Sequence, residues 1–175
     1  MEKGKIELMA PAGNFESLQA AIQNGADSVY FGVEQLNMRA RASVNFTMDD
    51  LSEIVMRCEE KNMRTYLTLN TIVYDHDLSV VKTLLKKAKE AGITAVVASD
   101  QAVITSAREI GMEVHISTQL NVTNIETVKF YSLFAQTMVL SRELSLRQVK
   151  YITKQIEKDQ IKGPSGDLVE IEIFG

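Results

Sequence analysis

A short apolar run followed by an amphipathic stretch recurs along the whole chain, and this alternation constrains the fold more than any other feature. Strands that alternate with helices predict a parallel sheet. Thr123 with Glu126 and Ser145 with Gln148 each predict a helix start through a capping box. The chain of 175 residues is long enough for a single domain, 1–175, with its own core. The expected strands cover residues 6–10, 27–32, 63–70, 94–99, 113–117, 137–141 and 168–174.

Two parallel architectures compete, an open doubly wound sheet and a TIM barrel. The first strand is followed by Ala10-Pro11-Ala12-Gly13-Asn14 rather than by the G-x-G-x-x-G of dinucleotide-binding sheets. The near-regular repeat therefore favours a TIM-like (β/α) barrel of parallel strands. The pattern gives about seven strands and six helices, whereas a complete barrel has eight of each.

The sequence ends inside a strand pattern, at residues 172–175. An unpaired apolar edge strand promotes aggregation, and proteins avoid it. We therefore expect the chain to be the N-terminal part of a barrel that stops before closure. The alternative is that another chain completes the barrel, for example in a homo-oligomer that covers the open edge.

Composition excludes several classes of protein. The net charge of −4 argues against nucleic-acid binding by overall charge, although it leaves room for a local basic patch. The single cysteine, Cys58, cannot form a disulfide framework, and its place on an apolar helix stripe predicts a core residue. No apolar run reaches the length of a membrane span, so we expect a cytoplasmic protein. Asp75-His76-Asp77 is interpreted as a helix start rather than a metal site.

Side chains alternate between the two sides of each expected strand. One side is apolar and should pack on helices; it includes Ile6, Leu8, Val29, Phe31, Val96, Ala98, Val114, Ile116, Val169, Ile171 and Ile173. The other side should point into the barrel and is polar. Two interpretations stay open for it, a ligand pocket and a hydrogen-bonded polar core. The inward set contains Glu7, Tyr30, Tyr66, Thr68, Asn70, His115, Ser117, Arg142, Glu170 and Glu172.

The candidate site residues follow the strand ends, where barrels of this kind carry their sites. His115 could transfer protons near neutral pH, or could be a satisfied core residue. Arg142 could bind a ligand or act as the counter-ion of Glu7, Glu170 and Glu172. The proposed catalytic residues are His115, Arg142 and Glu143, and the proposed substrate-binding residues are Arg39, Arg41, Asn70, Tyr74, Gln119 and Asn121, with no metal site.

The sequence resembles the peptidase U-32 family of collagenase-like proteases in six segments. The segments are ELMAPAG (7–13), GADSVYFG (25–32), NMRARASVNF (37–46), HISTQLN (115–121), SREL (141–144) and EIF (172–174). Together they cover essentially the whole chain in order. The resemblance also implies a TIM-like barrel, and it points to Arg39, Arg41, His115, Gln119, Asn121 and Arg142 as residues of the barrel mouth.

The same family includes proteins that hydroxylate a tRNA uridine, an rRNA cytidine or ubiquinone precursors without dioxygen. The resemblance implies a 4Fe-4S cluster on cysteines and prephenate for an intact protein, and no cofactor for this chain, which we expect to be inactive alone. An arginine-lined mouth would suit a small anionic ligand such as prephenate. The first functional hypothesis is therefore an RNA-hydroxylating enzyme, with RNA bound through a further C-terminal part. The alternatives are a collagenase-like peptidase and a non-catalytic subunit that binds RNA or protein.

Overall fold

The computed structural model describes residues 6–33 and 46–175. In this part of the chain seven strands form one sheet in the order β1 to β7, and every neighbouring pair is parallel. This order is the one expected when each strand is laid beside the previous one through a helical crossover. The strands are β1 (Met9–Pro11), β2 (Ser28–Phe31), β3 (Arg64–Leu69), β4 (Ala95–Ala98), β5 (Glu113–Ile116), β6 (Thr137–Val139) and β7 (Glu170–Glu172).

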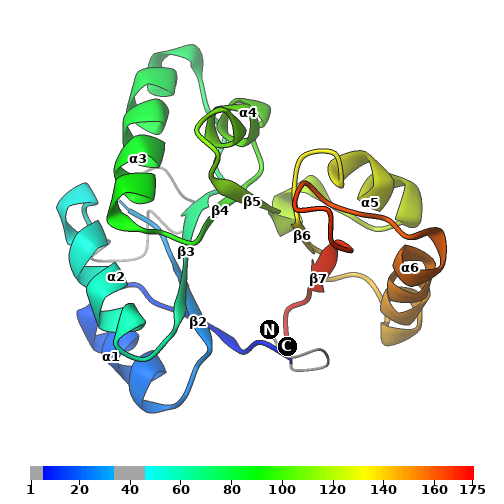
Figure 1. Ribbon diagram of the computed structural model, residues 1–175, viewed down its shortest axis with the longest axis horizontal. Helices are drawn as coiled ribbons and strands as arrows, with labels where there is room; N and C mark the ends of the chain where they lie inside the picture. The colour runs from blue at the N-terminus through cyan, green and yellow to red at the C-terminus, as the bar shows by residue number, and fades with distance from the viewer. Residues whose placement is uncertain (1–5, 34–45) are drawn as a thin grey trace.

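Helices connect the strands and lie on the outer face of the sheet, which curls around an interior (Figure 1). The helices are α1 (Phe15–Gln23), α2 (Leu51–Glu59), α3 (Leu78–Ala91), α4 (Gln101–Glu109), α5 (Ile125–Tyr131) and α6 (Leu146–Asp159). Three short 3-10 turns precede α2, α3 and α5: η1 (Met48–Asp50), η2 (Asp75–Asp77) and η3 (Thr118–Leu120). The predicted TIM-like (β/α) arrangement is confirmed, and β1 and β7 form the two edges of the described sheet.

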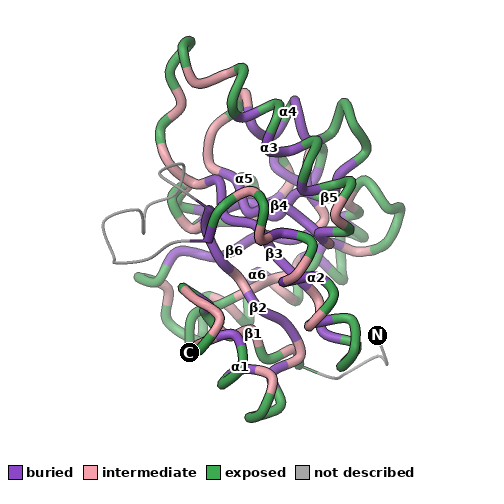
Figure 2. The backbone as a smooth tube through the Cα atoms, turned by 90° about the vertical axis from the view of Figure 1, so that its left-hand side faces the viewer, coloured by how far each residue is buried: buried purple, intermediate pink, exposed green. Residues whose placement is uncertain are grey.

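The core lies between the outer face of the sheet and the helices. Val29, Phe31, Val96, Ala98 and Ile116 are all fully buried there, as the alternation predicted. Figure 2 shows the buried strands surrounded by helices whose outer sides are exposed. The outer face therefore supplies most of the hydrophobic stabilisation, and the inner face is left for other chemistry.

Three residues of the predicted helix-facing set are exposed rather than in the core. Ile6 is 89% exposed and Leu8 is 61% exposed, so the prediction that they pack on helices is wrong. Both precede β1, which is an edge strand of the described sheet. Ile173, just after β7 at the other edge of the described sheet, is 48% exposed. Alternation of residue types correctly gives the side of a strand, but it does not show whether a neighbour covers that side.

The helix starts follow local capping chemistry. Asn14 caps α1 by accepting a hydrogen bond from the Ser17 backbone N–H at 2.8 Å. The predicted capping box at the start of α6 is confirmed, because Ser145 and Gln148 bond reciprocally. The predicted box at Thr123 is wrong: Asn124 is the cap of α5 and accepts from the Thr127 backbone N–H. Asparagine and threonine are both good caps, so their order in the sequence did not decide between them.

Candidate functional site in the barrel interior

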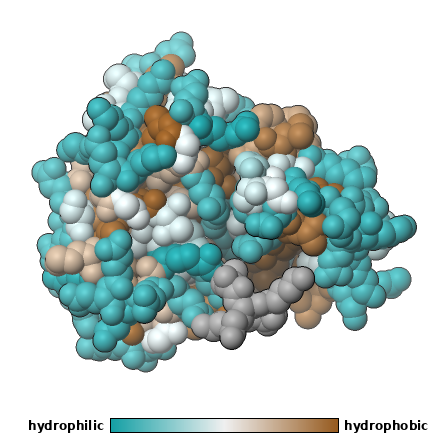
Figure 3. All heavy atoms as spheres, viewed as in Figure 1, coloured by the Kyte–Doolittle hydropathy of each residue, from teal (hydrophilic) through white to brown (hydrophobic). Residues whose placement is uncertain are grey.

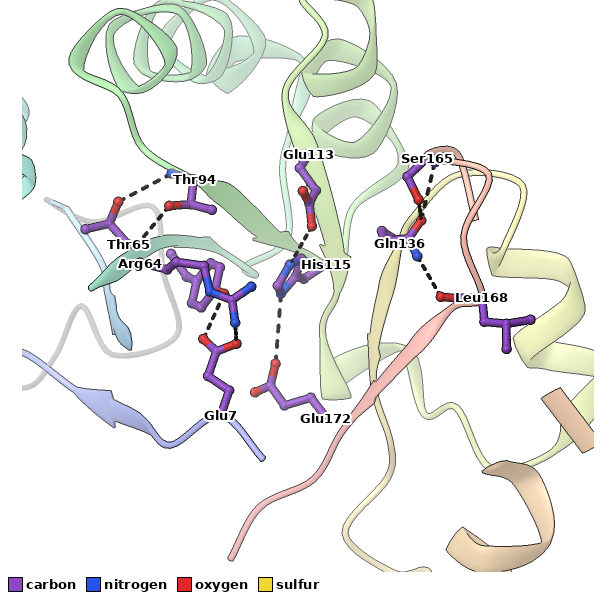
Figure 4. A network of polar contacts seen from close by, with 11 residues as sticks. Glu7, Arg64, Thr65, Thr94, Glu113, His115, Gln136, Ser165, Leu168 and Glu172 are labelled. Carbon is purple, nitrogen blue, oxygen red and sulfur yellow. Dashed lines mark hydrogen bonds and ion pairs between the residues drawn. The ribbon is translucent and has the colours of Figure 1, made fainter. Parts of the chain in front are cut away.

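Three side chains from alternate strands meet inside the barrel: Tyr66 of β3, His115 of β5 and Glu172 of β7. The ring centroids of Tyr66 and His115 are 4.7 Å apart, and Nδ1 of His115 lies 4.0 Å from Oε2 of Glu172. Alternate strands contribute to the same layer of a barrel interior, so the register of the sheet brings these three together. We call them the interior trio, and Figure 4 shows His115 between Glu113 and Glu172.

The tautomer of His115 follows from the hydrogen bond that its other ring nitrogen, Nε2, makes. Nε2 lies 3.2 Å from Oε1 of Glu113, and this hydrogen bond holds the pKa of the Glu113 carboxyl below its usual value. An ionised carboxylate can only accept, so Nε2 carries the proton. In the neutral imidazole, Nδ1 is then an acceptor, and it faces Glu172.

Glu172, whose side chain is 24% exposed, completes the arrangement with a buried Oε2 atom. Burial raises the pKa of its carboxyl above the usual value, although His115 partly opposes this effect. Oε2 of Glu172 and Nδ1 of His115 are both buried without a hydrogen-bond partner. The pair can hold one proton on either atom, and a small movement would let that proton pass between them. Such a pair can give a proton to a bound ligand or take one from it.

An ion pair lies beside the interior trio, at the N-terminal ends of the strands. Glu7 pairs with the Arg64 guanidinium, and it accepts a hydrogen bond from the Tyr66 hydroxyl at 2.9 Å. Burial raises the pKa of the Tyr66 phenol, so this hydroxyl is a neutral donor at physiological pH. Of the two alternatives for Arg142, the counter-ion role does not apply at Glu7, because Glu7 pairs with Arg64. The sequence pattern did not single out Arg64 or Glu113, although both face inward at the first residue of their strands.

The C-terminal ends of the strands, which form the barrel mouth, carry a second group of polar side chains. Nδ2 of Asn70 lies 3.5 Å from Oγ of Ser117, so the residues following β3 and β5 meet. Ser141 donates a hydrogen bond to Glu143, and this bond lowers the pKa of the Glu143 carboxyl. The guanidinium carbon of Arg142 lies 5.5 Å from the centre of the Phe174 ring.

The remaining predicted site residues lie apart from the interior trio. Tyr74 is 60% exposed and stacks on His76. Gln119 and Asn121 are exposed in the turn after β5, where Asn121 adopts a left-handed backbone with φ of 50°. Asparagine tolerates this conformation better than most residues, which explains its presence in that turn. Arg39 and Arg41 lie outside the described residues.

The cofactor chemistry of the family can be tested against the residues of this chain. Four cysteine thiolates usually hold an iron–sulfur cluster, whereas Cys58 is the single cysteine and is buried on α2. Burial raises the pKa of the Cys58 thiol to about 11, which disfavours the thiolate that a metal requires. The residues therefore do not fit a cluster. In the described residues no group of three or more histidine, cysteine or acidic side chains is placed to hold a metal ion.

The charge of the interior limits what it can bind. Among the described residues, the inward-facing side chains around the interior trio include the carboxyl groups of Glu7, Glu113 and Glu172 and the guanidinium of Arg64. An anion would be repelled there unless it carried its own proton. An anionic ligand would fit better at the mouth, close to Arg142.

The fold and the interior together define a class: a parallel (β/α) barrel whose interior is polar and titratable. The model of the family described as Peptidase family U32 matches residues 13–175. The chain belongs to this family. No helix in the described ranges has the length and apolarity that crossing a membrane requires.

Three similar proteins illustrate the range of the family. A collagenase of Porphyromonas gingivalis is 51% identical over 174 residues, which are 99% of this chain and 42% of that protein. The tRNA hydroxylation protein P1 of Bacillus subtilis is 30% identical over 156 residues, 87% of this chain and 37% of that protein. A solved U32 peptidase superposes with a TM-score of 0.70 at 14% identity, over 89% of this chain and 68% of that one. The chain thus spans less than half the length of the collagenase and of the tRNA hydroxylation protein. The solved structure, at 14% identity, supports the fold alone.

Proposed function

We propose that this protein takes part in the hydroxylation of a pyrimidine in tRNA or rRNA, and that the barrel is its small-molecule and base-binding domain. The observation that carries the proposal is the pair of His115 and Glu172, whose facing atoms are buried and lack hydrogen-bond partners. Buried polar atoms are nearly always paired, so two such atoms side by side favour a ligand over a purely structural role. Membership in a family with a tRNA hydroxylation protein supports the choice of RNA.

In this proposal each interior residue has a defined task. Glu113 fixes the tautomer of His115, so that Nδ1 faces Glu172 as an acceptor. Glu172 stores the proton, and His115 exchanges it with the bound molecule. The pair formed by Glu7 and Arg64, with the Tyr66 hydroxyl, holds the inner end of the site in place. An iron–sulfur cluster does not fit this chain, and no step is assigned to one.

A small anion such as prephenate is the proposed second ligand, at the mouth rather than in the interior. Arg142 is the described cation at the mouth, and Asn70 and Ser117 supply polar groups beside it. Arg39 and Arg41 would add further positive charge. Loss of prephenate binding in the double variant Arg39→Ala/Arg41→Ala, measured by calorimetry, would support this part of the proposal, and unchanged binding would refute it. An RNA substrate would place the protein in the cytoplasm.

Nucleoside mass spectrometry on total RNA tests the function directly. We expect a strain that lacks the gene to lose one hydroxylated pyrimidine, and the identity of that nucleoside would name the modified base. Identical nucleoside profiles with and without the gene would contradict the proposal.

A collagenase-like peptidase is the second candidate, and the 51% identity to a collagenase favours it. The chemistry of the described residues does not. Both histidines of the chain are described: His115 contacts Glu113, Glu172 and the Tyr66 ring, and His76 contacts Asp77 and Tyr74. Neither forms the hydroxyl–imidazole or thiol–imidazole pair that nucleophilic hydrolysis needs. Cleavage of gelatin by the purified protein, with RNA nucleosides unchanged in the deletion strain, would favour the peptidase.

A further inference from the structure

A groove lies outside the barrel, between the first turns of α5 and α6. Its volume is about 570 Å³, within the range of small-ligand sites. None of the residues that line it carries a carboxyl group, although the chain as a whole has a net charge of −4. The lining residues are Thr123, Asn124, Ile125, Ser145, Arg147, Gln148, Tyr151 and Ile152.

The first three turns of α6 form a basic stripe beside this groove. Arg147, Lys150 and Lys154 are all exposed, and the segment 146–156 contains no acidic residue. Positions three and four apart lie on the same side of a helix, so the three cations are neighbours. Figure 3 shows a hydrophilic surface at the edge of the molecule where α6 lies in Figure 1. The net negative charge of the chain thus conceals a local positive surface.

An aromatic ring stands within the basic stripe. Tyr151 lines the groove, is 58% exposed, and lies one helical turn after Arg147. A cation and an exposed aromatic ring one turn apart are the pair that binds a phosphate and stacks the attached base. A solvated surface helix would need the cations but not the exposed ring.

The groove is joined to the barrel mouth. The Ser141 backbone N–H donates to the Val122 carbonyl oxygen at 3.0 Å, and Val122 and Leu140 form a parallel bridge. Thr123 and Ser145, which line the groove, follow these bridged residues closely in the chain. A strand bound along the groove would therefore reach Arg142 and Glu143 at the mouth without crossing the rest of the surface.

We propose that the groove and basic stripe of α6 bind single-stranded RNA and lead one nucleotide toward the barrel mouth. This inference rests on the proposed function, because it assigns a surface to the RNA substrate. It places RNA binding on this chain, whereas from the sequence we expected RNA to bind through a further C-terminal part. Recognition is by phosphate charge and stacking, so we expect little sequence preference from this surface.

The test is fluorescence anisotropy of the purified protein with a labelled oligouridine of about a dozen nucleotides, at several salt concentrations. In the triple variant Arg147→Gln/Lys150→Gln/Lys154→Gln we expect Kd to rise by about tenfold or more at low salt, and the slope of log Kd against log salt to fall by about 2. Tyr151→Ala should weaken binding by about fivefold or more at every salt concentration, because stacking is not screened. The altered side chains are exposed, so melting temperatures should stay unchanged.

The matched control removes the same charge elsewhere. Lys61 is exposed in the turn after α2, and Lys82 and Lys86 are exposed on α3. Their triple change to Gln should leave Kd within about twofold. Equal loss of binding in both triple variants would show a general charge effect and overturn the proposal. Binding that polyglutamate abolishes as effectively as unlabelled RNA would also overturn it, in favour of an acidic protein partner.

The two proposals fail in different ways. One outcome is that the α6 variants bind RNA as well as the wild type does while the gene is still needed for a hydroxylated nucleoside. That result would refute RNA binding at the groove and leave the proposed hydroxylation in place. If instead the α6 variants lose RNA binding while deletion of the gene changes no nucleoside, RNA binding at the groove is supported and the proposed hydroxylation is refuted.

Discussion

His115 and Glu172 face each other inside the barrel with Nδ1 and Oε2 4.0 Å apart, and neither atom has a hydrogen-bond partner. His115 is 4% exposed, so solvent does not supply the missing bonds freely. Glu113 holds the other ring nitrogen, which leaves Nδ1 as the atom that meets a ligand or a proton. This geometry is the basis of the chemical role that we propose for the barrel interior.

The variant Glu172→Gln should be more stable than the wild type at neutral pH. The folded-state pKa of Glu172 is raised, so the wild type loses stability as pH rises from the usual carboxyl pKa through that raised value. The amide has no such penalty and can donate to Nδ1 of His115. We expect a melting temperature about 2–4 °C higher near pH 7.5, for a gain of about 1 kcal/mol. The gain should shrink as pH falls and vanish at about pH 3, where the wild-type carboxyl is protonated in both states. A pH-independent gain would contradict this account.

The variant Tyr66→Phe should be less stable. It removes the hydroxyl that donates to Glu7 at 2.9 Å and leaves that buried oxygen with one partner fewer. The expected loss is about 1 kcal/mol, or about 2–4 °C in melting temperature. Tyr151→Phe removes the same atom from an exposed ring and should change nothing measurable by thermal unfolding. Equal effects of the two changes would exclude a structural role for the bond to Glu7.

The variant Gly92→Ala should destabilise the end of α3. Gly92 has φ of 89° in the left-handed region, and an added Cβ would lie 3.4 Å from Cγ1 of Val55. The strain should cost about 1 kcal/mol in the free energy of unfolding, measured by urea titration. Gly13→Ala is the matched control, because nothing lies within 4 Å of its added Cβ. A Gly92→Ala protein as stable as the control would contradict the assigned conformation.

The thiol of Cys58 should react slowly with a disulfide reagent in the folded protein. The side chain is buried on α2, and burial raises its pKa to about 11. Reaction at about pH 8 should therefore require unfolding, and its rate should rise steeply as urea is added. Rapid labelling without denaturant would show that the α2 face is open to solvent.

The sequence predicted the barrel because each strand and helix carries its own local signal. The inward and outward sets of β2, β4 and β5 follow directly from alternation, and the caps at Asn14 and Ser145 follow from residue type. The edge residues Ile6 and Leu8 could not be placed, because their exposure depends on what covers the edge.

The site was harder to predict than the fold. His115 and Glu172 are 57 positions apart by sequence number, and only the register of three strands brings them together. The partner of Glu7 is Arg64 and not Arg142. Glu7 and Arg64 lie at the N-terminal ends of the strands, whereas Arg142 follows the C-terminal end of β6. Glu113 lies two residues before His115 on β5, so alternation places both side chains on the inner face, but it does not show that they bond to each other.

Complementation of a deletion strain tests the central claim most directly. Total RNA is analysed by nucleoside mass spectrometry after return of the wild-type gene, the Glu172→Gln gene or the Lys82→Gln gene, with protein levels checked by immunoblot. We predict that wild type and Lys82→Gln restore a hydroxylated pyrimidine, and that Glu172→Gln does not, although it is the more stable protein. Full restoration by Glu172→Gln at equal protein level would contradict the account of the interior site.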